Sequence, residues 1–180
     1  IGRYQLADFE RLIRTGRRST QVAQDEACAA FKLAIGMRGV NLHGAVFDGV
    51  EPNPKDTNVR DGLEVFRKEH CDIIVTVGGG SPHDCGKGIG IAATHEGDLY
   101  SYAGIETLTN PLPPIVAVNT TAGTASEVTR HCVLTNTKTK VKFVIVSWRN
   151  LPSVSINDPL LMLGKPAPLT AATGMDALTH

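Results

Sequence analysis

The last residues of the chain have the types and the spacing of metal ligands. Asp176 and His180 stand four positions apart, and in a helix two such residues lie one above the other on a single face. A carboxylate oxygen and an imidazole nitrogen can then bind the same divalent cation. Metal sites use about three or four protein ligands, so we expect the chain to end partway through such a site. From the spacing alone, a solvated Asp/His pair on a helix surface is the commoner arrangement.

A run of glycines predicts an anion-binding site. It follows the β-branched run 73–77, which is typical of a strand buried on both faces, and it precedes a helix whose first turn tolerates Pro82. Glycine lets the backbone approach a phosphate, and the N–H groups at the helix start point at the anion. The residues of this segment, named here the glycine turn, are Gly78, Gly79, Gly80 and Ser81.

Two other interpretations of the glycine turn are open. A tight strand-to-helix turn needs glycine for its dihedral angles even without a ligand. The segment is not a G-x-G-x-x-G motif, and it departs from a Walker A loop because Gly88 stands where that loop needs Ser or Thr for Mg²⁺. A nucleotide triphosphatase or kinase is therefore only a weak alternative.

A second polar segment follows the apolar run 115–118, and we name residues 120–124 the threonine loop. Ligands of α/β proteins bind at the carboxyl ends of parallel strands, which makes this loop a second candidate, although an ordinary polar loop fits the pattern equally well. Its hydroxyl-bearing residues are Thr120, Thr121 and Thr124. Lys142 can reach a phosphate or ribose from a hairpin further on, but most such lysines are simply solvated.

Helix and strand patterns alternate from about residue 45 to 125, which predicts an α/β fold with a mostly parallel sheet covered by helices. We expect strands at 45–47, 73–77, 115–118 and 153–156 and a hairpin formed by 132–134 and 141–146. Helices are expected at 21–36, from a cap at Thr57 to about 70, after Pro82, and near Thr170 beyond the proline-interrupted stretch 164–168.

The bulk composition limits the kinds of partner. The 18 basic and 18 acidic residues give a formal net charge of zero, and no basic run occurs, which argues against nucleic acid and anionic membranes. No apolar stretch approaches the ~18 residues that span a bilayer. The four cysteines are scattered without C-x-x-C spacing, which favours reduced thiols and a cytoplasmic location.

Three ordered segments of the chain resemble the signatures of the iron-containing (group III) alcohol dehydrogenases. They are residues 78–84, residues 120–124 with Glu127, and residues 174–180. The resemblance runs from about Phe47 to His180. It implies a Rossmann-like α/β domain for NAD over residues 1–164 and, over 165–180, the start of a helical metal-binding domain, as in the dehydroquinate synthase-like architecture.

The resemblance also implies roles for single residues. The glycine turn would hold the cofactor's pyrophosphate, Asp84 would lie near the cofactor, the hydroxyls of the threonine loop would line the nicotinamide side, and Lys142 would contact a ribose. Asp176 and His180 match the first two metal ligands of the family and would be the catalytic residues. The other two ligands of the family are histidines far downstream, which this chain does not contain.

Residues 1–44 are expected to be atypical of the family. They lack its opening strand and the V-T-D-like segment whose Asp reads the adenosine ribose. Arg17 and Arg18 fall roughly where that segment would stand. Two arginines near a ribose would favour a 2′-phosphate and thus NADP, and the other interpretation is that this stretch does not fold as in the family.

The function that the resemblance implies is reversible hydride transfer between NAD(H) and a small primary alcohol or aldehyde. The metal, Fe²⁺ by the family's preference with Zn²⁺, Mn²⁺ or Ni²⁺ also suited to such ligands, would act as a Lewis acid. We expect a homo-oligomer with neither nucleic-acid nor membrane partners, and no catalysis by these 180 residues alone. The alternatives are an NAD/zinc lyase of the dehydroquinate synthase type and a nucleotide-binding module without catalysis.

Overall fold

The computed structural model of the chain describes residues 44–179. The chain divides into two compact units, Ile1–Asp48 and Gly49–His180, and the fold below is that of the second. The helix expected at 21–36 lies outside the described residues. The strand expected at 45–47 is wrong, because residues 44–50 form no regular structure and Val46 is exposed, with no neighbouring strand among the described residues to pair with.

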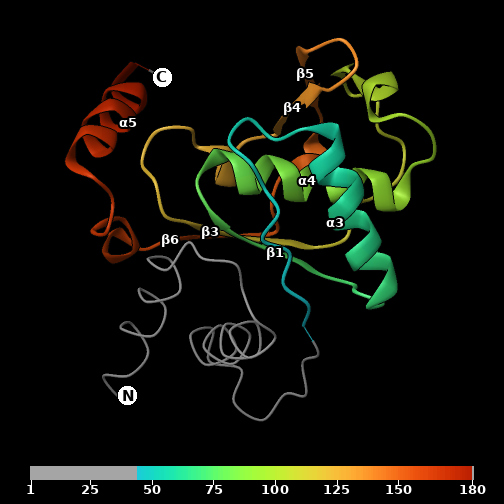
Figure 1. The fold of residues 1–180 in the computed structure, drawn as a ribbon, viewed down its shortest axis with the longest axis horizontal. Coiled ribbons are helices and arrows are strands. Elements are labelled where there is room, and N and C mark those ends of the chain that lie inside the picture. Colours follow the sequence, from blue (N-terminus) through green and yellow to red (C-terminus); the bar gives the residue numbers. More distant parts are fainter. Residues whose placement is uncertain (1–43, 180) are drawn as a thin grey trace. The chain divides into compact units, whose positions relative to one another are not determined.

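A parallel sheet of three strands carries the fold, and it confirms the predicted α/β architecture. It consists of β1 (Ile74–Gly78), β3 (Ile115–Asn119) and β6 (Val154–Asn157), in the order β1-β3-β6 (Figure 1). Gly78 pairs with Asn119, and Asn119 pairs with Asn157. Because the last residues of the three strands are in register, the loops that leave them begin side by side.

A second sheet of three strands is mixed, in the order β2-β5-β4. The predicted hairpin is confirmed as β4 (His131–Asn136) and β5 (Val141–Val146), which pair antiparallel. The strand β2 (Gly104–Ile105) pairs parallel to β5 and was not predicted, because two residues show no periodicity. Within residues 44–179, four short 3₁₀ helices complete the connections: η1 (Leu99–Tyr102), η2 (Ser126–Val128), η3 (Trp148–Asn150) and η4 (Pro159–Met162).

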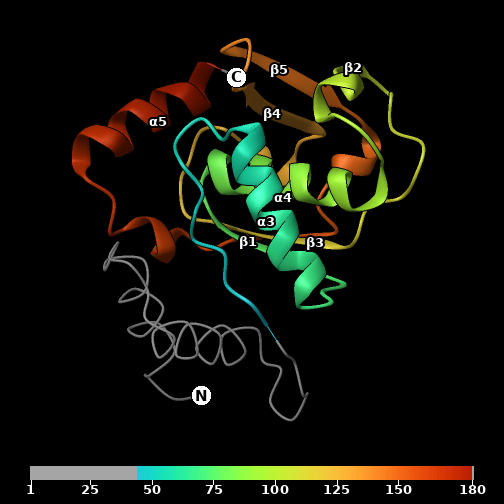
Figure 2. The ribbon, with the colours of Figure 1, turned by 45° about the vertical axis from the view of Figure 1, so that its right-hand side comes forward.

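The helix α4 (Gly80–Thr94) is the centre of the packing. It lies between β1 and β4, and α3 (Asp56–Lys68) packs against it (Figure 2). Glycines allow this close approach: a Cβ at Gly88 would lie 2.7 Å from Cγ2 of Val59 on α3, and a Cβ at Gly86 would overlap Cγ2 of Thr76 on β1. Pro82 stands in the first turn of α4, as expected.

The start of α3 differs from the prediction that Thr57 caps it. The helix begins at Asp56, with Lys55 as the N-cap residue, so Thr57 already lies inside the first turn. The cause is tertiary: Lys55 forms a parallel β-bridge with Thr135, which holds it extended and lets the helix start directly after it.

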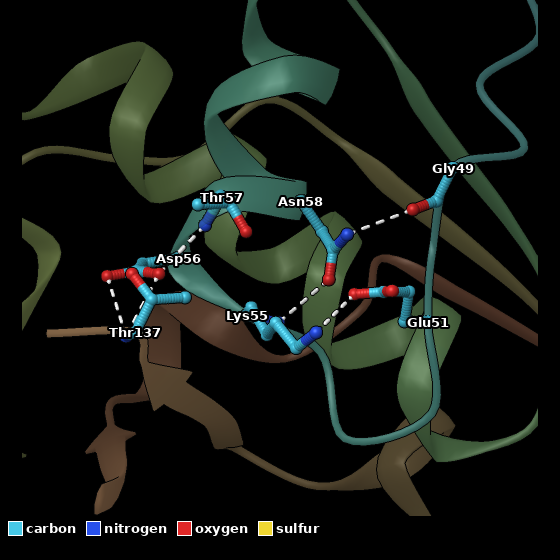
Figure 3. Close-up of polar contacts among 7 residues, drawn as sticks. All are labelled: Gly49, Glu51, Lys55, Asp56, Thr57, Asn58 and Thr137. Atoms are coloured by element: carbon cyan, nitrogen blue, oxygen red, sulfur yellow. Dashed lines mark hydrogen bonds and ion pairs between the residues drawn. The ribbon is translucent and has the colours of Figure 1, made fainter. Parts of the chain in front are cut away.

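Side chains around this helix start replace the expected threonine cap (Figure 3). Asn58 accepts a hydrogen bond from the Lys55 N–H (2.9 Å) and donates one to the Gly49 carbonyl (2.9 Å). The Asp56 carboxylate accepts from the N–H groups of Thr57 (2.9 Å) and Thr137 (3.2 Å), which ties the helix to the hairpin turn. The N–H groups of the N-cap residue Lys55 and of Thr57 in the first turn thus find side-chain acceptors.

The last helix, α5 (Ala167–Thr179), begins earlier than predicted. Pro168 lies inside its first turn, where a missing N–H costs no hydrogen bond, so the proline does not interrupt it. Among the described residues of α5, none is buried, and Met175 and Leu178 are 59% and 78% exposed. No helix within residues 44–179 is long and apolar enough to cross a membrane. Cys71, Cys85 and Cys132 carry free thiols.

The close packing of α3 on α4 predicts opposite effects for two glycine substitutions on α4. Gly88→Ala inserts a methyl group at 2.7 Å from Val59 and 3.1 Å from Leu134. Overpacking of about 1–3 kcal/mol outweighs a helix-propensity gain of about 1 kcal/mol, so this variant should lose stability. Gly90→Ala meets its nearest atom only at 3.5 Å and should be neutral or more stable. Urea unfolding followed by circular dichroism measures both, and equal midpoints for the two variants would contradict this packing.

Candidate cofactor and metal site

The glycine turn joins the end of β1 to the start of α4. Gly78 has φ +145°, which favours glycine, and a Cβ there would lie 2.7 Å from Cγ of Pro82. Gly79 is the N-cap residue and Gly80 the first residue of the 15-residue helix, with the partly exposed Ser81 next to it. The first N–H groups of a helix have no partner within it, and the helix dipole favours an anion there. The strand, glycine and helix follow one another as expected, and the binding of an anion at this helix start stays a prediction.

The threonine loop lies directly against the glycine turn. A Cβ on Gly79 would lie 3.1 Å from Oγ1 of Thr121, and a Cβ on Gly80 would lie 3.1 Å from Oγ1 of Thr124. A side chain at either glycine would require the neighbouring threonine to shift by a few tenths of an ångström. Two segments that are about forty residues apart in the sequence and were both predicted as cofactor-binding are thus in contact.

Backbone hydrogen bonds fix this contact. The N–H of Thr120 donates to the Gly78 carbonyl at 2.9 Å, which extends the pairing of β1 and β3 into the two loops. The side chain of Asn119 accepts from the Thr121 N–H (3.1 Å) and donates to Oδ1 of Asn157 (3.0 Å). Thr120 itself is buried, so its side chain belongs to the core beneath the loop, whereas Thr121 is half-buried and Thr124 is exposed.

The helix α5 meets the same loop at Gly123. A Cβ there would lie 2.7 Å from the Thr173 carbonyl oxygen and 3.1 Å from Oδ2 of Asp176, and the φ of +134° also favours glycine. The glycine turn, the threonine loop and the predicted metal ligand Asp176 therefore follow one another in a continuous set of contacts. His180 lies outside the described residues. Within residues 44–179, no group of three or more His, Cys, Asp or Glu side chains could hold a metal ion.

Asp84 points toward the segment that follows the threonine loop. Its Oδ1 accepts a hydrogen bond from the Ser126 hydroxyl at 2.8 Å. Burial raises the pKa of Asp84 to about 6, although the Ser126 hydrogen bond and the charge of Lys87 oppose the shift. The carboxyl group is thus engaged within the protein, one helical turn from Gly80.

Two buried residues of α4 were not predicted to matter. Lys87 is fully buried and bonds backbone carbonyls of the segment after the threonine loop. His83 is buried with Nδ1 2.7 Å from Oγ1 of Thr76, and burial together with the nearby Lys87 charge lowers the pKa of His83 to about 4. Isolated polar residues in a helix carry no signal of burial, so the sequence offered no way to find them.

Lys142, predicted to contact the ribose, lies on β5 in the second sheet. Its ammonium group donates to Oδ1 of Asn53 at 2.7 Å, in an exposed position. Asn53 itself has φ +55° in the loop before α3. In the described structure, the Lys142 side chain thus contacts the 49–55 loop. A contact of Lys142 with the cofactor stays a prediction.

Comparisons with known proteins show the family to which the chain is similar. Residues 1–159 match the family described as iron-containing alcohol dehydrogenase, so the match includes the opening stretch 1–44. The 1,3-propanediol dehydrogenase of Citrobacter freundii is 91% identical over 152 residues, which cover 84% of this chain and 39% of that protein. The chain thus spans about two fifths of the length of this relative.

Solved structures show the same fold. A crystal structure of 1,3-propanediol oxidoreductase superposes on this chain with a TM-score of 0.81 and 80% sequence identity. The superposed region covers 92% of this chain and 42% of that protein's chain. Sulfoacetaldehyde reductase from Bifidobacterium kashiwanohense, solved in complex with NAD⁺, superposes with a TM-score of 0.71 at 38% identity and covers 86% of this chain and 40% of that one. The Rossmann-like sheet that the resemblance implied is confirmed. By its family match and by its fold, the chain belongs to the iron-containing alcohol dehydrogenases.

Proposed function

We propose that the natural protein containing this chain is an NAD- and metal-dependent oxidoreductase that interconverts 1,3-propanediol and 3-hydroxypropanal, with Fe²⁺ as the metal and Zn²⁺ or Mn²⁺ as possible replacements. The observation that carries the proposal is the contact of Thr121 and Thr124 with the glycine turn, with Asp176 beside Gly123 of the same loop. The name of the relative at 91% identity supports the substrate, although the chain covers only 39% of that relative.

The residues of the glycine turn suit the diphosphate of NAD. A helix start with glycine at the N-cap and at the first helical position offers N–H donors and carries no Cβ of its own that would keep an anion away. Thr121 is half-buried and Thr124 is exposed beside these donors, and their hydroxyls can orient the adjoining part of the cofactor. We assign Ser81 a further hydroxyl contact to the diphosphate, and Lys142 a contact to the ribose.

The residues present suit a metal only in part. Asp176 offers a carboxylate oxygen, a ligand type that divalent iron, zinc and manganese accept. We propose His180 as the second ligand, and a complete site needs further ligands beyond those in residues 44–179. The contact of α5 with Gly123 brings Asp176 to the loop that we assign to the nicotinamide side, so metal and cofactor would share one site.

This arrangement suggests a separate role for each segment of the site. When bound, NAD⁺ accepts a hydride, and the metal polarises the oxygen of the alcohol or aldehyde. The glycine turn binds the cofactor, the threonine loop orients it, and Asp176 holds its place against the same loop. The chain thereby holds the hydride acceptor and the reacting carbon close together, which is the main contribution of positioning to catalysis.

Substitution of the glycine turn tests the cofactor assignment. Gly80→Ala places a methyl group 3.1 Å from Oγ1 of Thr124, where the hydroxyl must shift and the approach to the N–H donors narrows. We expect NADH to bind about tenfold or more weakly, which corresponds to about 1.4 kcal/mol. Fluorescence titration of NADH on the natural full-length protein measures this change. Gly90→Ala on the same helix is the control, and equal NADH affinities of the two variants would contradict the assignment.

Removal of the carboxylate tests the metal assignment. Asp176→Ala in the full-length protein should abolish the retention of iron, because a site that loses one of its few ligands binds weakly, while NADH binding should stay nearly intact. Elemental analysis after gel filtration measures the metal content. Asp61→Ala removes an exposed carboxylate on α3 and serves as the control. Full metal content in Asp176→Ala would show that this residue is not a ligand.

A further inference from the structure

Lys87 is a charged residue at the centre of α4 with no exposure to solvent. Its ammonium group lies within hydrogen-bond distance of three backbone carbonyls, those of Ser126 (2.7 Å), Thr129 (2.9 Å) and His131 (2.7 Å). The Ser126 hydroxyl lies at 3.2 Å from the same nitrogen. An ammonium group has three protons, so the carbonyls alone satisfy it.

These carbonyls all belong to the segment that leaves the threonine loop. Backbone carbonyls that converge on one buried cation fix the course of a chain over several residues, because loss of the cation would leave them unpaired away from water. Ala125 stands between Thr124 and this segment with φ +53°, a left-handed conformation that is uncommon outside glycine. Such a conformation persists where its surroundings determine it.

Asp84 provides a second connection between the same two elements. Its carboxylate accepts from the Ser126 hydroxyl at 2.8 Å, and Asp84 and Lys87 are three positions apart, on one face of α4. Ser126 is only two residues from Thr124, whose Oγ1 lies 3.5 Å from the Ser126 N–H. The helix that begins with Gly80 therefore holds, one and two turns further on, the chain that carries Thr124.

We propose that Lys87 is a positioning residue for the cofactor, acting through residues 126–131 to hold the Thr124 hydroxyl beside Gly80. Because the turn and the lysine belong to one rigid helix, this bonding sets the distance between the two parts of the cofactor site. The inference rests on the proposed function, since it assumes that NADH binds between the glycine turn and the threonine loop.

A double-mutant cycle on NADH affinity tests the proposal in the full-length protein. Lys87→Met keeps the length of the side chain and removes its hydrogen bonds, and Thr124→Ala removes the hydroxyl through which Lys87 is inferred to act. We expect Lys87→Met to weaken NADH binding by about tenfold, and by less than about twofold when Thr124 is already Ala. Lys68→Met, which alters an exposed lysine on α3, should leave the affinity unchanged.

Additive effects would overturn the inference, because a lysine that only stabilises the fold changes the NADH affinity equally with or without the Thr124 hydroxyl. If Lys87→Met does not fold, Ser126→Ala goes through the same cycle, since it removes the hydroxyl that contacts both Lys87 and Asp84. Coupling between Ser126→Ala and Thr124→Ala supports the proposal, and additivity contradicts it. Failure of the unaltered protein to bind NADH would overturn the proposed function itself, and this inference with it.

Discussion

The alignment of two neighbouring parallel strands is the constraint on which the site depends. β1 and β3 end in register, with Gly78 opposite Asn119, and the Thr120 N–H donates to the Gly78 carbonyl just beyond them. This pairing places the glycine turn and the threonine loop side by side before any side chain contributes. The absence of Cβ atoms at Gly79 and Gly80 then lets two threonine hydroxyls approach the start of α4. Ligand sites of α/β folds lie at such strand ends for the same reason.

The helix α4 links this site to the rest of the fold. Its first turn provides the N–H donors, and its small residues Gly86 and Gly88 allow β1 and α3 to pack closely on it. Asp84 and Lys87, on the same helix, hold the chain beyond the threonine loop. A shift of α4 would therefore move the donors, the loop and the helix packing together.

The sequence predicts the parts of this fold whose patterns are local. The β-branched run of β1, the hairpin of β4 and β5 and the glycine turn all carry signals within a few residues, and each is confirmed as structure. The predictions that were wrong concern residues whose state depends on distant partners. Thr57 is not a cap because Lys55 pairs with Thr135, some eighty residues away. Residues 45–47 lie in a stretch without regular structure. The sequence could not predict the burial of Lys87 for the same reason. Its partners are distant backbone carbonyls, and every residue type has a backbone carbonyl.

The structure of the full-length protein with NAD and Fe²⁺ bound is the measurement that tests this account most directly. We expect the diphosphate oxygens to accept hydrogen bonds from the N–H groups at Gly79 and Gly80, with Thr121 and Thr124 bordering the same cofactor. We expect Asp176 to be a ligand of the iron. A diphosphate bound away from the start of α4, or an iron site that excludes Asp176, would contradict it.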